Sequence, residues 1–278
     1  MISELRQRLQ ALQRPAGVED DPGTLPFNIE AIDLVLGDGL ARSALHEIAA
    51  ASEAHLAAAT GFVLSLSSSS CPALGRASTS SGSVIKQGVD SRDKPGHDER
   101  RASVIWIAED MALAESGAPY GPGLDAFGLA PERLVTVSVA HRRELLWAME
   151  EALRCRAVAA VIGELRHDDI DTVAVRRLSL AAAESGAPAF LLRAAPPSDP
   201  STAATRWIVG AAPSFSSPSF GGGSERAPRF AVQLVRNRRG PLGSWIIEWS
   251  DDDERFTLAT HAQPVAAPAF DRPYRKIA

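Results

Sequence analysis

Apolar side chains along the chain follow two patterns, short continuous runs and stretches with helical spacing. Continuous runs predict buried strands at residues 103–108, 134–139, 158–162 and 189–193. Apolar positions three or four residues apart predict amphipathic helices at 144–155 and 170–185, between these strands. Strands that are separated by single helices need right-handed crossovers, so the series predicts a mostly parallel sheet with helices on both faces.

Further strands and helices are predicted before and after this central series. Residues 25–37 predict a compact helical turn, 44–49 a strand, and 52–66 a helix rich in Ala and Leu. After residue 200 the pattern becomes antiparallel, with predicted strands at 206–209, 229–236 and 244–249, the last two joined by a hairpin. The predicted fold class is therefore α/β, a mostly parallel sheet flanked by helices with a C-terminal antiparallel hairpin extension.

Four segments divide the chain. Residues 1–24 hold a short amphipathic helix at 2–14 and a polar linker, and residues 25–210 hold the α/β domain. Residues 67–102 interrupt it with a serine-rich and then charged stretch that cannot bury enough apolar area to offset its chain entropy. Its part at 84–99 resembles a translated bacterial palindromic repeat, so we expect a disordered insertion. Residues 211–256 extend the same domain as a β-hairpin, and 257–278 form a flexible tail.

Composition limits which cellular compartment and which classes of ligand suit the protein. The 278 residues are 45% hydrophobic, and 34 acidic against 29 basic residues give a net charge of −5, so contact with nucleic acid must be local. We find no run of eighteen apolar residues and no export signal, which predicts a cytoplasmic protein without membrane contact. Cys71 and Cys155 form no CxxC motif, and the six histidines form no HExxH motif, so neither a disulfide scaffold nor a metal site is expected.

A strand that runs into a helix near the start of an α/β chain is where a phosphate-binding loop lies. Here residues 27–48 resemble the segment that leads into the P-loop of the RecA superfamily. The resemblance includes Ile32-Asp33, the Gly-x-Gly-Leu pattern that begins at Gly37, and the Glu47-Ile48 pair. The P-loop pattern GxxxxGK[ST] should follow.

The phosphate-binding residues of that pattern are missing. Aligned without gaps, the first glycine falls at Ala50, the second at His55, the lysine at Leu56 and the hydroxyl residue at Ala57. These side chains can neither neutralise phosphate charge nor hold Mg²⁺. The sequence therefore predicts no nucleotide cofactor and no catalytic residues, which means that the protein is not an enzyme.

Two acidic residues test that conclusion. Glu109 follows the strand at 103–108, where recombinases carry a carboxylate that activates water. Glu164 follows Gly163 after the strand at 158–162, where a Mg²⁺-orienting Asp would be expected, so that acid is missing or displaced by one residue. Glu109 is either an ordinary acid at a strand end or a vestige of catalysis.

Beyond this short motif, several longer stretches of the chain resemble one family in particular, the ImuA family. Its members are pseudo-RecA proteins of the bacterial DNA-damage response. The matching stretches are residues 25–47, 120–129, 131–134, 144–155, 176–181, 204–207 and 243–249. The resemblance implies a non-catalytic accessory protein of SOS-induced, error-prone translesion synthesis. The partners that it implies are an ImuB-like Y-family protein and an error-prone replicative-type polymerase, with RecA as a further candidate.

A cluster of three arginines is the first candidate contact surface. Arg236, Arg238 and Arg239 lie at the tip of the predicted hairpin, where their guanidinium groups could bind a few phosphates of DNA weakly and in a salt-dependent way. The alternative is a solvated turn, with the acidic residues Asp251–Glu254 close by.

Aromatic residues supply the second and third candidates. Trp147 lies off the stripe formed by Leu145, Met149 and Leu153, so it is either an exposed anchor for a partner or part of the core. Phe270 and Tyr274 stand among basic residues and prolines in the tail, which is typical of a peptide that docks on a partner or contacts DNA, and equally of a frayed terminus.

Two other functions stay open at this point. One is a RecA-like DNA-dependent ATPase with a divergent phosphate loop, which would show nucleotide turnover. The other is a cell-division inhibitor of the SulA type, which would cause filamentation without any polymerase. The length, the parallel α/β series and the N-terminal motif favour the accessory protein.

Overall fold

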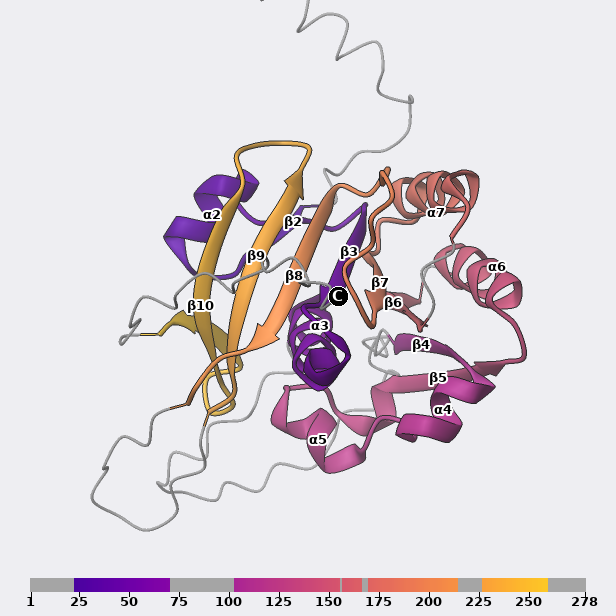
Figure 1. Cartoon of the computed structure of the whole chain (residues 1–278), viewed down its shortest axis with the longest axis horizontal. Helices are drawn as coiled ribbons and strands as arrows, with labels where there is room; N and C mark the ends of the chain where they lie inside the picture. Colours follow the sequence, from indigo (N-terminus) through magenta and orange to yellow (C-terminus); the bar gives the residue numbers. More distant parts are fainter. Residues whose placement is uncertain (1–22, 71–102, 156, 167–169, 215–226, 260–278) are drawn as a thin grey trace, which may run out of the picture.

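The computed structural model describes residues 23–70, 103–155, 157–166, 170–214 and 227–259, and these form one nine-stranded mixed sheet with helices on both faces (Figure 1). The strand order is β11-β10-β9-β8-β3-β7-β6-β4-β5. The predicted helix at 2–14 and the tail residues Phe270 and Tyr274 lie outside the described residues.

Six neighbouring strands are parallel, which confirms the predicted α/β architecture. The strands β5 and β7 occupy the predicted ranges. The bounds of the six are β3 Leu45–Ala50, β4 Ser103–Glu109, β5 Leu134–Val139, β6 Val158–Leu165, β7 Ala189–Arg193 and β8 Thr205–Ala211.

The sheet continues in the antiparallel direction beyond β8, as predicted, through β9 Arg229–Asn237 and β10 Gly243–Ser250. A further strand, β11 Arg255–Leu258, pairs with β10 and was not predicted. It is held by Phe256, which is buried with its ring centroid 5.0 Å from that of Trp249. A separate two-stranded sheet joins β1 Thr24–Leu25 to β2 Leu40–Ala41.

Helices cover the two faces of the sheet unequally. On one face lie α2 Glu30–Leu36, α3 Leu56–Ser70, α4 Asp110–Ser116 and α5 Gly121–Ala126, and on the other lie α6 Arg142–Leu153 and α7 Thr172–Ser185 (Figure 1). The 3₁₀ turns η1 Glu53–His55 and η2 Pro131–Arg133 precede α3 and β5. Each face has its own apolar core. None of the helices in the described ranges has the length and apolarity needed to cross a bilayer.

Helix α3 begins and ends four residues later than the sequence predicted, and this corrects the start of the insertion. We expected the helix to end at residue 66 and the insertion to begin at 67, but α3 continues to Ser70. The serine hydroxyls donate to backbone carbonyls one turn earlier, as Ser67 does to Val63 at 2.8 Å and Ser69 to Ser65 at 3.0 Å. Serines that satisfy their own hydroxyl groups in this way can continue a buried helix. The rest of the predicted insertion, residues 71–102, lies outside the described residues.

Candidate functional site

The N-terminal motif that resembles the RecA superfamily has a structural role here. The carboxylate of Asp33 accepts hydrogen bonds from the backbone N–H of Phe27 at 2.8 Å and of Ile29 at 3.2 Å, so it fixes the start of α2. Gly39 has a φ of 121°, and a side chain there would bring its Cβ within 2.6 Å of the carbonyl oxygen of Leu25. These motif residues therefore shape the chain before β3.

The turn from β3 into α3 occupies the place of the phosphate loop. Two of its backbone N–H groups are used internally: that of Ala51 donates to the carbonyl of Val209 at 2.8 Å, and that of His55 donates to the carbonyl of Ser52 at 2.8 Å. The His55 Nδ1 accepts a hydrogen bond from the backbone N–H of Ala211 at 3.1 Å. The imidazole thus ties the turn to the end of β8.

The other aligned positions are apolar in the structure as well as in the sequence. Ala50 is buried at the end of β3, Leu56 packs against the apolar core, and Ala57 presents a methyl group at the surface. A triphosphate needs a positive charge and free backbone N–H groups. None of the aligned positions carries a Lys or Arg, and the N–H groups of His55 and Leu56 already donate to the carbonyls of Ser52 and Glu53.

Glu109 lies away from this turn. It is the last residue of β4 and lines an open groove between α6 and α7, on the opposite face of the sheet from α3. It occupies the N-cap position of α4, yet its side chain makes no capping hydrogen bond. The structure therefore places Glu109 at the head of a groove.

Glu164 lies within β6, which continues three residues beyond its predicted end to Leu165. Its carboxylate pairs with the guanidinium of Arg166 at 2.8 Å, and both side chains are largely buried. Arg166 also donates to the hydroxyl of Ser116. An arginine thus compensates the acid at the position where a Mg²⁺-orienting carboxylate was expected. Among the residues that the structure describes, no group of three His, Cys, Asp or Glu side chains could hold a metal ion.

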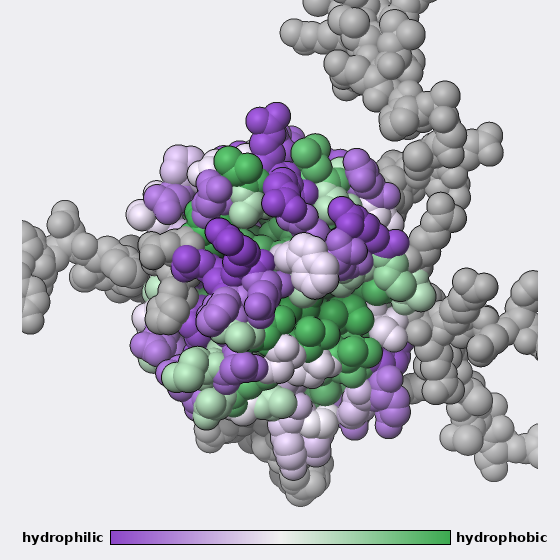
Figure 2. Space-filling view, turned by 90° about the vertical axis from the view of Figure 1, so that its right-hand side faces the viewer, coloured by the Kyte–Doolittle hydropathy of each residue, from purple (hydrophilic) through white to green (hydrophobic). Residues whose placement is uncertain are grey.

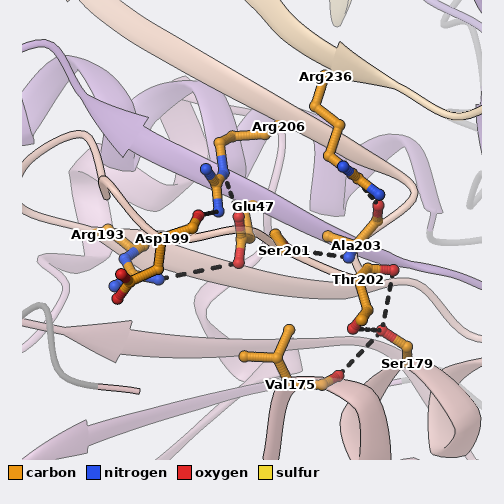
Figure 3. Close-up of polar contacts among 10 residues, drawn as sticks. All are labelled: Glu47, Val175, Ser179, Arg193, Asp199, Ser201, Thr202, Ala203, Arg206 and Arg236. Carbon is orange, nitrogen blue, oxygen red and sulfur yellow. Dashed lines mark hydrogen bonds and ion pairs between the residues drawn. The ribbon is translucent and has the colours of Figure 1, made fainter. Parts of the chain in front are cut away.

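A buried charged cluster, which the sequence analysis missed, lies on three neighbouring strands (Figure 3). Glu47 on β3 is fully buried, with a carboxylate oxygen 2.5 Å from Nε of Arg206 on β8 and the other oxygen 3.8 Å from a guanidinium nitrogen of Arg193 on β7. Arg206 also donates to the carbonyl of Asp199 at 2.9 Å. Of the Glu47-Ile48 pair in the motif, Ile48 therefore packs in the apolar core and Glu47 forms ion pairs. A charged residue inside an apolar strand was the sequence signal for this cluster.

His46, the neighbour of Glu47, points to the other face and is also fully buried. Its Nε2 donates to the carbonyl of Ala41 at 2.8 Å, and its Nδ1 accepts from the hydroxyl of Thr205 at 2.8 Å. Thr205 accepts in turn from the indole N–H of Trp207 at 3.0 Å. Burial lowers the pKa of His46 to about 4, so the imidazole is neutral in the fold.

The groove between α6 and α7 has a volume of about 1030 Å³ and mixed charge. The ion pair between Arg177 and Glu150, at 2.5 Å, joins the two helices across it. Trp147 lines the groove and is 59% exposed, whereas Leu145, Met149 and Leu153 are buried. The remaining lining residues are Glu109, His141, Arg142, Arg143, Glu144, Leu146, Asp171, Val173 and Ala174. Alternating charge beside an exposed Trp favours a protein ligand over a polyanion.

The hairpin arginines are partly used in holding the fold. Arg236 donates through Nε to the carbonyl of Ala203 at 3.0 Å, and Arg238 donates to that of Thr202 at 3.3 Å. These bonds fasten the hairpin to the segment before β8. The expected neighbourhood of Asp251–Glu254 was wrong, because these residues form the turn between β10 and β11, at the end of β10 far from the hairpin tip.

Comparison with known proteins gives the following relations. No protein-family model matches the chain. Protein ImuA from two strains of Caulobacter vibrioides is 30% identical over 161 residues, which is 54% of this chain. The match spans 62% of the length of these curated relatives. The crystal structure of the RadB recombinase superposes with a TM-score of 0.49 and 12% identity, over 82% of this chain and 97% of that chain.

Proposed function

We propose that this chain is an ImuA-type accessory protein of SOS-induced, error-prone translesion DNA synthesis that acts through protein contacts and does not hydrolyse ATP. The similarity to Protein ImuA over 161 residues supports the family assignment. Its partners are an ImuB-like Y-family protein and an error-prone replicative-type polymerase, with RecA as a further candidate.

The observation that carries the non-catalytic part of the proposal is the turn at residues 50–57. His55 and Ala51 use the backbone groups that a phosphate loop would present to its ligand, and Leu56 stands where the lysine would be. Glu164 already has a cation in Arg166. A site that lacks the positive charge and has its acid neutralised cannot stabilise phosphoryl transfer.

The α6/α7 groove is the contact surface that we assign to the ImuB-like partner. Trp147 supplies a large exposed anchor on a rigid helix, and Val173 on the facing helix is 61% exposed. Aromatic anchors with charged neighbours are typical of the residues that dominate protein interfaces.

Binding of the purified chain to the ImuB-like protein from the same genome tests the proposal. Biolayer interferometry with the immobilised full chain should give saturable binding with a dissociation constant in the micromolar range or below. A chain that captures no ImuB-like protein at micromolar concentration would refute the scaffold role.

Two further measurements separate the other functions. Nucleotide turnover that disappears in Glu109→Gln would establish the ATPase instead. Filamentation on overexpression in cells that lack the partner polymerases would establish a cell-division inhibitor. Neither outcome is expected.

A further inference from the structure

The α6/α7 groove continues past the ion pair between Arg177 and Glu150 into a second hollow. This hollow has a volume of about 480 Å³ and is lined by the C-terminal parts of both helices, with Leu153 on α6 and Leu180 on α7. We propose that residues 2–14 of this chain lie in the groove as an amphipathic helix and compete there with the partner. The competition rests on the proposed function, which makes the groove the partner surface, whereas the docking does not.

The groove has the length and the apolar walls that a third helix needs. Helices α6 and α7 each link two parallel strands, so they run side by side in the same direction. With 14 residues α7 is about 21 Å long, and residues 2–14 as a helix are about 20 Å long. Trp147, Val173 and Leu180 border the groove and are 59%, 61% and 58% exposed. Figure 2 faces the side of the molecule that carries these helices and shows apolar side chains among hydrophilic ones.

The sequence of residues 2–14, which lie outside the described residues, supplies a matching apolar face. Ile2, Leu5, Leu9 and Leu12 are spaced by three or four residues, which places them on one stripe of the predicted helix. A helix this short is marginal in water unless its apolar stripe packs against other residues. The segment therefore needs an apolar surface on which to dock.

The described chain begins close to the end of α7. The carbonyl of Gly23 accepts a hydrogen bond from the N–H of Arg42 at 3.2 Å. The carbonyl of Arg42 accepts from Ala44 at 2.9 Å, and that of Ala44 accepts from Ala189, the first residue of β7, at 3.0 Å. Helix α7 ends only four residues before β7 begins. Because residues 15–22 can extend over about 27 Å, they can carry residues 2–14 from Gly23 to the groove.

Charge also favours this occupant. Residues 2–14 carry three arginines and one glutamate, a net charge of +2, and Arg6 and Arg8 flank the apolar stripe on its two sides. The two hollows of the groove are lined by five acidic and four basic residues, a net charge of −1. The acidic residues are Glu109, Glu144, Glu150, Asp171 and Glu184. The segment and the groove are therefore of opposite net charge.

A second apolar surface lies near Gly23 but offers no room for large side chains. Leu34 on α2 and Leu242 at the hairpin tip are 70% and 60% exposed. The hollow between α2 and the hairpin has a volume of about 10 Å³, which holds one water molecule and no leucine side chain. The α6/α7 groove is therefore the better seat for the stripe.

Fluorescence quenching by acrylamide tests the docking in the full chain. Trp147 dominates the quenching, because the other four tryptophans are buried or half-buried. A docked segment shields Trp147, so Leu9→Asp in the stripe should raise the quenching constant about twofold. Gln7→Asp lies on the opposite side of the predicted helix, brings the same change in charge, and should leave the quenching unchanged. Trp147→Phe should remove the difference between the two variants.

Binding to the ImuB-like protein gives a second readout. Leu9→Asp should tighten binding about threefold, because the partner no longer competes with the segment, and Gln7→Asp should bind like the parent chain. Equal quenching in the parent chain and Leu9→Asp, or the same rise in both variants, would overturn the docking. Shielding of Trp147 that grows with protein concentration would assign the groove to the segment of a second copy and would also overturn it. Quenching that rises without tighter binding would support the docking and refute the groove as the partner surface.

Discussion

Glu109 and Glu164, the two carboxylates that could have served nucleotide hydrolysis, lie on opposite faces of the sheet. Glu109 lines the α6/α7 groove, whereas Glu164 alternates with Leu165 and projects toward the face that bears α3. The two carboxylates therefore project to different surfaces of the sheet, and Glu164 is already paired with Arg166.

The first prediction is that nucleotide leaves the stability of the chain unchanged. A ligand that binds only the folded state raises the melting temperature in proportion to the logarithm of its concentration over its dissociation constant. Because residues 50–57 contain no Lys or Arg to neutralise phosphate charge, millimolar ATP with Mg²⁺ should give no shift in a thermal denaturation experiment. Glu109→Gln should behave like the parent chain. A concentration-dependent rise that Glu109→Gln abolishes would contradict this account.

The second prediction concerns the buried charged cluster. Replacing Glu47 by Gln removes the carboxylate that compensates Arg206 at 2.5 Å. Breaking a buried ion pair costs about 3–5 kcal/mol, because the remaining charge stays buried. Urea denaturation should show a loss of this order. Asp253→Asn is the control, since its pair with Arg255 is about half exposed and should contribute less than about 1 kcal/mol. Equal effects of the two substitutions would show that the cluster does not stabilise the fold.

The architecture could be predicted because apolar periodicity encodes it directly. The parallel strands are continuous apolar runs, and β5 and β7 occupy the expected ranges. The strand β11 could not be predicted for a physical reason. It depends on one buried side chain, Phe256, which packs on Trp249 of the neighbouring strand β10, and its four residues carry too little periodicity to be detected.

The candidate site could be predicted only in part. The loss of the phosphate loop follows from residue types alone, since Leu56 cannot carry charge. The faces of Glu109 and Glu164 depend on where β4 and β6 end, and element boundaries are the least certain part of a sequence pattern. The pairing of Arg166 with Glu164 is local, and could have been proposed from their spacing of two residues. The arginines that meet Glu47 come from distant strands, which only the sheet order brings together.

The third prediction is a loss of stability in mild acid that depends on His46. The unfolded imidazole takes up a proton near pH 6.5, whereas burial lowers the pKa of His46 in the fold to about 4. Between these values the unfolded chain binds more protons, so the free energy of unfolding falls as the pH falls. The fall attributable to this residue is on the order of 3 kcal/mol from pH 6.5 to below pH 4.

Urea denaturation at a series of pH values measures this effect. His46→Gln should be less stable at neutral pH, because the hydrogen bonds to Ala41 and Thr205 are disturbed, but it should lose that part of the acid dependence. The difference between the two pH profiles isolates the titration of His46. Parallel profiles would show that His46 is not the group responsible.

The fourth prediction separates binding from folding at Trp147. Its side chain is 59% exposed, so Trp147→Ala should change the free energy of unfolding by less than about 0.5 kcal/mol. As an interface anchor it should contribute about 2 kcal/mol or more, which is roughly a thirtyfold weaker affinity for the ImuB-like protein by biolayer interferometry. Leu242→Ala is the control, because Leu242 is equally exposed, at 60%, but lies at the hairpin tip, away from the groove. If both variants bind like the parent chain, the α6/α7 groove is not the partner surface.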